Sequence, residues 1–261
     1  MARELGCFDE NTLGQLVEIR DSLEIYRRDG MTPKNLAVIR QVLSGDVWGR
    51  VLNLPVALMN RSRLLREHAP IKAAVTAQLA VAIGIETVAP VRLGNLSRIL
   101  LDHNLTKPGG LDTPYRLVFP HYDVKNRLDL DYPLDSELTA LIDEYVHEFR
   151  PSLLRGSNEL WLFPGEAGGS KDAKTLSDQV AERIEKATGL VITVHQFRHA
   201  AAALWLMHHP GDYETVRRVL GHRNIQTTIK FYCGLETTHA NIMFGTLVRK
   251  LMKYDSEPDT D

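Results

Sequence analysis

The segment from residue 193 to 234 limits what this chain can fold into more than any other stretch. It begins with His195 and Arg198, which are three residues apart and therefore lie on one face of a helix. The apolar run Ala200–Met207 follows and is long enough to form a buried helix. The start of the segment thus predicts a helix that presents a histidine and an arginine together.

Two further short helices are expected in the same segment. Gly221 ends the first of them, Tyr213–Leu220, and His222 comes directly after that stop. The second places Tyr232 on the same side as Ile225 and Ile229. Three consecutive elements therefore deliver two histidines, an arginine and a tyrosine, which is a candidate site for an anionic phosphate with a phenol in it.

The overall charge gives this interpretation no support. The chain of 261 residues has a formal net charge of -2, whereas nucleic-acid binders are more often basic. Its 44% hydrophobic and 25% charged residues are typical of a globular protein. The basic residues are unevenly placed, because five gather between positions 50 and 72: Arg50, Arg61, Arg63, Arg66 and Lys72.

Cysteine usage and hydropathy favour the cytoplasm. Cys7 and Cys233 offer no disulfide framework or cysteine-rich zinc module. The first ten residues lack the apolar core of a signal peptide, and no uninterrupted apolar run reaches the roughly 18 residues of a membrane span. We expect no membrane association.

Residues 1–67 read as a helical region that is short for a domain of its own. Helical spacing relates two apolar groups: Leu13, Leu16, Val17 and Leu23, then Leu36, Ile39 and Leu43. Gly30 and Pro33 predict a break between the two helices, and Leu54-Pro55 predicts another. The region is either part of a larger helical domain or a layer that packs on the domain C-terminal to it.

A larger domain is expected over residues 68–253. Pro70 suits the first position of a helix whose stripe of apolar residues predicts burial. Ala89-Pro90 opens the next helix, in which Leu93, Leu96 and Leu100 form the core face, while Arg92 and Asn95 share another face.

A small antiparallel sheet is expected next. The strands are predicted at Tyr115–Phe119, His121–Lys125 and Leu128–Tyr132, with turns at Pro120 and at Asn126-Arg127. The later periodic segments predict helices again, at Leu138–Phe149 and at Leu176–Ile184, the latter ended by Gly189. The predicted fold is mainly α with one small antiparallel β-sheet (α+β).

The end of the chain predicts an amphipathic helix and an acidic tail. Ala240, Phe244, Leu247 and Leu251 form the apolar stripe, with Thr237 or Thr238 as the cap. Residues 254–261 are expected to be disordered, because they are acidic and carry few apolar side chains.

Phosphoryl transfer without a metal ion needs a particular set of groups. Negative charge spreads over the non-bridging oxygens, so guanidinium forks stabilise the transition state, while a nucleophile attacks and the leaving oxygen takes up a proton. Residues of the right types are Arg92, Arg198, His195, His222, Tyr232 and Lys125. Composition alone does not select them from the 31 lysines and arginines.

The order of these residues resembles a known family. TVHQFRHAAAAL, then VLGH, then TTIKFY resembles the signature of the tyrosine recombinase (phage integrase) family, which is His-x-x-Arg-His, Leu-Gly-His and a tyrosine. Arg92 in PVRLGNL resembles the first catalytic arginine, and Lys125 lies where the family's hairpin carries its lysine. The resemblance covers roughly residues 68–252 and implies the family's catalytic-domain fold.

The resemblance also implies a mechanism. Tyr232 attacks a DNA phosphate and forms a 3′-phosphotyrosyl link, which conserves the bond energy, so neither ATP nor a metal cofactor is needed. Arg92, Arg198 and His222 stabilise the transition state, His195 assists proton transfer, and Lys125 protonates the leaving oxygen. The expected partners are double-stranded DNA and further copies of the chain, four subunits on two duplexes, in the cytoplasm and on the nucleoid.

Three features depart from the family pattern. The commonest members have Glu or Asp three residues after the first arginine, where this chain has Asn95. The gap from His222 to Tyr232 is one residue longer, which places Phe231 where the tyrosine usually stands. Residues 1–67 are short for the core-binding domain that usually precedes the catalytic one, so the chain is a fragment or a member with a reduced clamp.

Alternative interpretations remain for individual residues and for the whole. His199 is expected to pack or to support other residues, His208 and His209 to end the helix, and Cys233 to be incidental. The rival functions are a DNA-binding member of the family without catalysis, a type IB topoisomerase and a metal-dependent hydrolase. The last rests on the one-turn spacing of His195 and His199, but the zinc-protease helix has a glutamate where this chain has Gln196.

Overall fold

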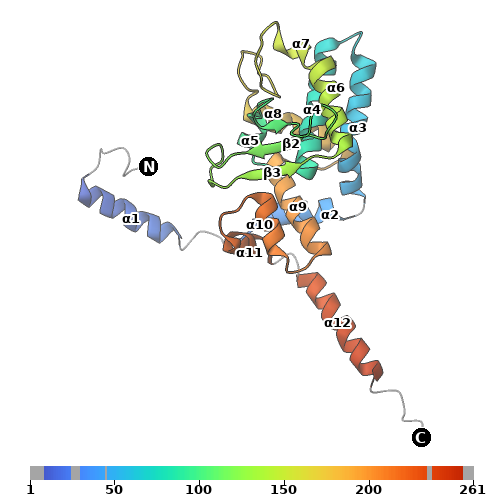
Figure 1. Ribbon diagram of the computed structural model, residues 1–261. Coiled ribbons are helices and arrows are strands. Elements are labelled where there is room, and N and C mark those ends of the chain that lie inside the picture. Colours follow the sequence, from blue (N-terminus) through green and yellow to red (C-terminus); the bar gives the residue numbers. More distant parts are fainter. Residues whose placement is uncertain (1–8, 25–29, 45, 234–236, 255–261) are drawn as a thin grey trace.

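The computed structural model describes residues 9–24, 30–44, 46–233 and 237–254 (Figure 1). The N-terminal helices are α1 (Glu10–Glu24), α2 (Pro33–Leu43) and α3 (Val47–Leu65). The central part contains α4 (Pro70–Val88), α5 (Leu93–Ser97), β1 (Leu105–Thr106), β2 (Arg116–Phe119), β3 (Leu130–Pro133), α6 (Ser136–Glu144), the π-helical turn η1 (Tyr145–Phe149) and α7 (Pro151–Leu154). The last helices are α8 (Ala173–Thr188), α9 (Val194–His208), α10 (Tyr213–Leu220), α11 (Ile225–Tyr232) and α12 (Thr237–Tyr254).

Helix α4 is the centre of the main core. It packs against α3, α6, η1, α7, α8 and α9, and its buried side chains run almost without interruption from Ala73 to Glu86. By length and composition α4 could cross a membrane, but 72% of its apolar window is buried inside the fold. That burial identifies α4 as the core helix of a globular body.

Helices α2 and α3 share this core. Ile39, Val42 and Met59 are fully buried in the same cluster as the side chains of α4 and α9. Of the two expectations for the N-terminal region, α2 and α3 fulfil the second, because they form a layer that packs on the domain C-terminal to them. In Figure 1, α1 and α12 extend away from this body in opposite directions.

The predicted break at Leu54-Pro55 is wrong, because Pro55 lies inside α3. Proline removes one backbone donor and tends to kink a helix. Here Pro55 is buried, and it lies next to Gly84 of α4, where an added Cβ would be 3.7 Å from the proline ring. The close packing of α3 on α4 therefore holds the helix together through the proline.

The fold class is confirmed, since a mainly helical chain carries one three-stranded antiparallel sheet in the order β1-β2-β3. In the second pairing Leu117 lies opposite Tyr132 and Phe119 opposite Leu130. Strand β1 is only two residues long and was not predicted.

The predicted strand His121–Lys125 is wrong. These residues form successive turns between β2 and β3, in which Asp123 N–H donates to Pro120 O (2.8 Å) and His121 N–H donates to Asp129 Oδ1 (2.6 Å). Such local bonds compete with a strand ladder for the same backbone groups. Lys125 is thus carried by a loop between the two strands.

The helices of the segment 193–234 begin and end close to where the pattern predicts. α10 has the predicted bounds, and α9 runs to His208 with His209 as its C-terminal cap. Gly189 ends α8 in the left-handed conformation, as expected. Helix α12 begins at Thr237, while the predicted cap falls on side chains outside the described ones, and the acidic tail beyond Tyr254 and Cys7 also lie outside the described residues.

Candidate active site

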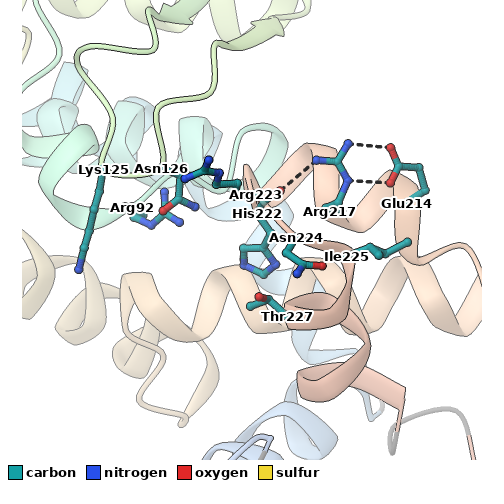
Figure 2. A pocket seen from close by; sticks show the side chains of 10 residues that line it. All are labelled: Arg92, Lys125, Asn126, Glu214, Arg217, His222, Arg223, Asn224, Ile225 and Thr227. Atoms are coloured by element: carbon teal, nitrogen blue, oxygen red, sulfur yellow. Dashed lines mark hydrogen bonds and ion pairs between the residues drawn. The ribbon is translucent and has the colours of Figure 1, made fainter. Parts of the chain in front are cut away.

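A polar cavity of about 970 Å³ brings together residues from three parts of the chain. Arg92 follows α4, Lys125 lies in the β2–β3 loop, and His222 follows α10. Figure 2 shows the three side chains in this cavity, with Arg217 and Glu214 on the side of α10. Its lining residues are Arg92, Lys125, Asn126, Glu214, Arg217, His222, Arg223, Asn224, Ile225 and Thr227.

Arg92 is the N-terminal cap residue of α5 and has an extended backbone, so it precedes the helix instead of sharing a helix face with Asn95 as predicted. The turn is closed by Asn95 N–H donating to Arg92 O (2.8 Å). Burial, followed by the positive charge of Arg198, lowers the pKa of Arg92. Arg92 has no hydrogen bond or ion pair with a side chain among the described residues, so its donors are open to a ligand.

Arg198 is buried in α9 and is held at both ends of its guanidinium. Nη1 donates to Pro90 O and Nη2 donates to Leu220 O. A guanidinium has five N–H donors, so these two bonds leave others for a phosphate. Arg198 therefore clamps the α4–α5 link to the end of α10, and its charge lies beside that of Arg92.

Gly221 positions His222. It ends α10 with φ +61, a conformation that suits glycine, and an added Cβ would lie 2.7 Å from Leu130 of β3. Two further bonds tie the sheet to this turn: Asn126 Nδ2 donates to Gly221 O (2.6 Å) and Tyr132 Oη donates to Val219 O (2.7 Å). These contacts explain why Lys125 and His222, distant in sequence, line the same cavity.

His222 is oriented by a residue that the sequence did not single out. Its Nδ1 lies 2.9 Å from Oγ1 of Thr228, which is fully buried in α11. If the threonine hydroxyl donates to Nδ1, then Nε2 carries the proton and can donate to a ligand. Burial and the charges of Arg198, Arg92 and Arg217 lower the pKa of His222 to about 4, so the ring is neutral at pH 7.

Tyr232 does not line this cavity. It is 2% exposed at the end of α11, and its hydroxyl lies 2.9 Å from Nδ1 of His199. Nε2 of His199 in turn lies 3.1 Å from Nε2 of His195. Tyr232, His199 and His195 therefore form a hydrogen-bonded chain in the interior.

His199 has the supporting position expected for it, and the chain also shows how the two histidines of α9 are used. Their Nε2 atoms face one another. Among the described residues, no group of three or more His, Cys, Asp or Glu side chains is arranged to hold a metal ion. The structure thus brings Arg92, Arg198, Lys125 and His222 together, and places His195 and Tyr232 in a neighbouring group.

Acidic groups near the cavity are engaged elsewhere or buried. Glu214 accepts hydrogen bonds from Arg217 and Arg218, which lower its pKa to about 2. Glu86, at the end of α4, is completely buried. No sequence pattern marked Glu86 or Thr228, because each lies on a helix whose spacing predicts only a buried face. The cavity itself carries a surplus of positive charge.

Comparisons with known proteins agree with this arrangement. The sequence model of the phage integrase family matches residues 65–239. Over 97 residues the chain is 32% identical to a tyrosine recombinase XerD of Pseudomonas aeruginosa, which covers 37% of this chain and 32% of that protein. Over 127 residues it is 28% identical to a putative integrase/recombinase of Sinorhizobium fredii, which covers 48% of this chain and 47% of that protein.

Solved structures share the fold. Two are complexes of the XerH site-specific recombinase with its difH substrate. The post-cleavage complex matches with a TM-score of 0.53 and 19% identity over 73% of this chain and 50% of that one, and the pre-cleavage complex with 0.50 and 20% over 67% and 47%. The chain spans about a third to a half of the length of the curated relatives that it matches. Because the family model covers well over half of the sequence, the chain belongs to the phage integrase family.

Proposed function

We propose that this protein is a site-specific recombinase that breaks and rejoins DNA through a covalent phosphotyrosyl intermediate on Tyr232. The observation that carries the proposal is the convergence of Arg92, Lys125 and His222 on one cavity, with Arg198 beside Arg92. A phosphodiester carries the charge and the oxygen acceptors that such donors bind. The similar XerH structures are complexes with a DNA substrate, which supports DNA as the ligand.

Each residue has one task in the proposed reaction. The Tyr232 oxygen attacks the phosphorus as the bond to the 5′ oxygen breaks, and the new Tyr–phosphate ester conserves the energy for rejoining. The phenolic proton passes to His195, and Lys125 gives a proton to the departing 5′ oxygen. Arg92, Arg198 and His222 stabilise the charge on the non-bridging oxygens.

The position of Tyr232 adds a requirement to this mechanism. Burial raises the pKa of its phenol, while burial and the charge of His195 lower the pKa of His199 to about 4. The proton therefore stays on the phenol while Tyr232 is bonded to His199. Cleavage requires DNA binding to move Tyr232 out of this contact and into the cavity.

We also propose that copies of the chain assemble through α12. Large apolar side chains of α12 are exposed: Ile242, Met243, Phe244, Leu247 and Leu251. A second cavity of about 440 Å³ lies between α3, α9 and α10, and it is lined mainly by apolar groups, among them Trp48, Leu52 and Trp205. The apolar stripe of α12 from a neighbouring copy fits this surface, and on DNA four copies would exchange strands between two duplexes in the cytoplasm, at the nucleoid.

Sedimentation of the protein on DNA tests the assembly. Phe244→Asp places a charge on the apolar stripe, and we expect it to reduce the species with more than one copy. Thr246→Asp adds the same charge on another face of α12 and is the matched control. Equal assembly of the Phe244→Asp variant and the parent would contradict docking through α12.

A covalent-trapping assay tests the proposed activity. The substrate is a library of nicked duplexes with a randomised central segment, from which the short cleaved strand diffuses away and leaves the enzyme attached. We expect a protein–DNA adduct that resists denaturant and forms in excess chelator. Salt-sensitive DNA binding without an adduct would instead indicate a member that binds DNA but does not cleave it.

Two other outcomes identify the remaining rivals. Relaxation of supercoiled plasmid without preference for a sequence would indicate a topoisomerase of type IB. Cleavage that leaves no protein on the DNA and stops in chelator would indicate a metal-dependent hydrolase. Both outcomes would contradict the proposal.

A further inference from the structure

Glu86 is a buried acid without a hydrogen-bond partner. It lies in the last turn of α4, its side chain is completely buried, and neither carboxyl oxygen has a partner among the described residues. Buried polar groups are nearly always paired, and an unpaired one costs on the order of 1–3 kcal/mol. A buried carboxyl group at this point therefore calls for a physical explanation.

The charged group that acts on Glu86 is Arg198. Burial raises the pKa of Glu86 well above its usual range, and the positive charge of Arg198 is the one opposing influence. Conversely, burial lowers the pKa of Arg198, and the carboxyl of Glu86 is the first of the groups that raise it again. The two groups thus compensate one another in an environment where water screens little.

The backbone places both groups at one junction. Helix α4 packs against α9, which carries Arg198. Arg198 Nη1 donates to the carbonyl of Pro90, four residues beyond Glu86, and Nη2 donates to that of Leu220. These two carbonyls are neutral, so Glu86 is the acid that offsets the guanidinium.

Asn95 shows why a carboxyl group at this junction matters. The commonest relatives have an acid at the position of Asn95, one turn after the first arginine. Here the amide is uncharged, and its Nδ2 is buried without a partner. Glu86 reaches the same group of basic residues from the other side of the α4–α5 link.

We propose that Glu86 is a positioning residue, whose carboxyl group holds the buried guanidinium of Arg198 in the orientation that meets a DNA phosphate. The inference rests on the proposed function, because it concerns the same phosphate. A merely structural role would predict another result, since replacing an unpaired buried acid by an apolar side chain of similar size is neutral or stabilising.

The first test measures the single-turnover rate of adduct formation at saturating DNA, together with the free energy of unfolding. We expect Glu86→Gln to slow the reaction about tenfold and Glu86→Leu about 100-fold, in the range seen when a supporting contact is lost, with stability unchanged or raised. Gln78→Leu is the control, because Gln78 is also buried in α4 with an unpaired oxygen but bonds to Tyr145. Wild-type rates for both Glu86 variants would overturn the proposal.

A double-mutant cycle asks whether Glu86 acts through Arg198. In an Arg198→Lys background, which loses the fixed fork of the guanidinium, we expect Glu86→Gln to have almost no further effect on the rate. Independent, multiplicative losses would contradict the proposal.

A measurement without DNA separates this inference from the proposed function. We expect the Arg198 side-chain N–H signal in a ¹⁵N NMR spectrum to be sharp and protected from exchange in the parent and in Gln78→Leu. In Glu86→Leu it should broaden and lose protection. An unchanged signal would refute the role of Glu86 even if the protein cleaves DNA, whereas absence of any adduct with the expected NMR change would refute only the proposed activity.

Discussion

The hydroxyl of Tyr232 lies 2.9 Å from Nδ1 of His199, and both side chains are buried. This contact keeps the phenol apart from the cavity that Arg92, Lys125 and His222 line. Burial favours the neutral form of each partner, so no proton moves from the tyrosine to the histidine. In the protein without DNA, the candidate nucleophile is therefore held protonated and out of reach.

Loss of this contact should be measurable as stability. Tyr232→Phe leaves Nδ1 of His199 without its partner in the interior, so we expect the free energy of unfolding to fall by about 1–2 kcal/mol. In a His199→Leu background the same change should cost much less, because the partner is already gone. Urea titrations of the four proteins check this. Additive losses would mean that the two groups do not interact.

Acid should destabilise the protein through its buried histidines. The pKa values of His199 and His222 are lowered to about 4 in the fold, whereas an unfolded histidine has a value of about 6.5. Between these values the unfolded chain binds more protons, so stability is fully present above pH 6.5 and is lost as the pH falls toward 4. For the more buried His199 the loss is on the order of 3 kcal/mol.

Urea midpoints at pH 7, 5.5 and 4.5 measure this dependence, with His199→Asn as the comparison. Asparagine can still accept a hydrogen bond from Tyr232 but does not titrate in this range. The stability of that variant should fall less steeply with acid. Parallel curves for the two proteins would contradict the shifted pKa of His199.

Thr228 should matter for catalysis although it does not line the cavity. Thr228→Val keeps the buried volume but removes the hydroxyl that holds Nδ1 of His222. We expect the single-turnover rate of cleavage to fall about 10–100-fold, as for other contacts that orient a functional histidine. Thr228→Ser retains the hydroxyl and should stay within a few-fold of the parent. Equal rates for the valine and serine variants would show that this hydrogen bond does not orient His222.

Lys125 should be needed only to protonate the leaving group. Lys125→Ala should slow cleavage of an ordinary phosphodiester by about 10²–10⁴-fold, the usual range for a general acid. A substrate with sulfur in place of the bridging 5′ oxygen has a leaving group that needs no proton, and it should restore the rate. Arg92→Ala should not be restored, because Arg92 acts on the non-bridging oxygens. A sulfur substrate that leaves Lys125→Ala slow would remove Lys125 from this role.

Periodicity and stop signals predicted the helices well. Gly189 and Gly221 end α8 and α10 because both glycines have positive φ values, which is a local property of the residue. The two errors come from tertiary contacts. Packing on Gly84 keeps Pro55 inside α3, and the bond from His121 N–H to Asp129 holds the expected second strand in a turn.

The candidate site was predictable only in part. The spacing of His195, Arg198 and His222 follows from neighbouring elements, and a resemblance to a family supplied Arg92 and Lys125. The partners that orient these side chains come from long-range contacts: Asn126 bonds to Gly221, 95 residues later, and His199 bonds to Tyr232. Glu86 carries no signal in the sequence, since an acid on an apolar helix is noticed only when the fold shows what surrounds it.

The most direct measurement identifies the residue that becomes linked to DNA. The adduct from the nicked duplex is digested with a protease and a nuclease, and the peptide that carries the residual nucleotide is sequenced by mass spectrometry. The proposed mechanism predicts a phosphotyrosine ester at Tyr232 joined to a 3′ end, and no adduct from the Tyr232→Phe variant. A link to Tyr213, or an adduct that persists in Tyr232→Phe, would contradict it.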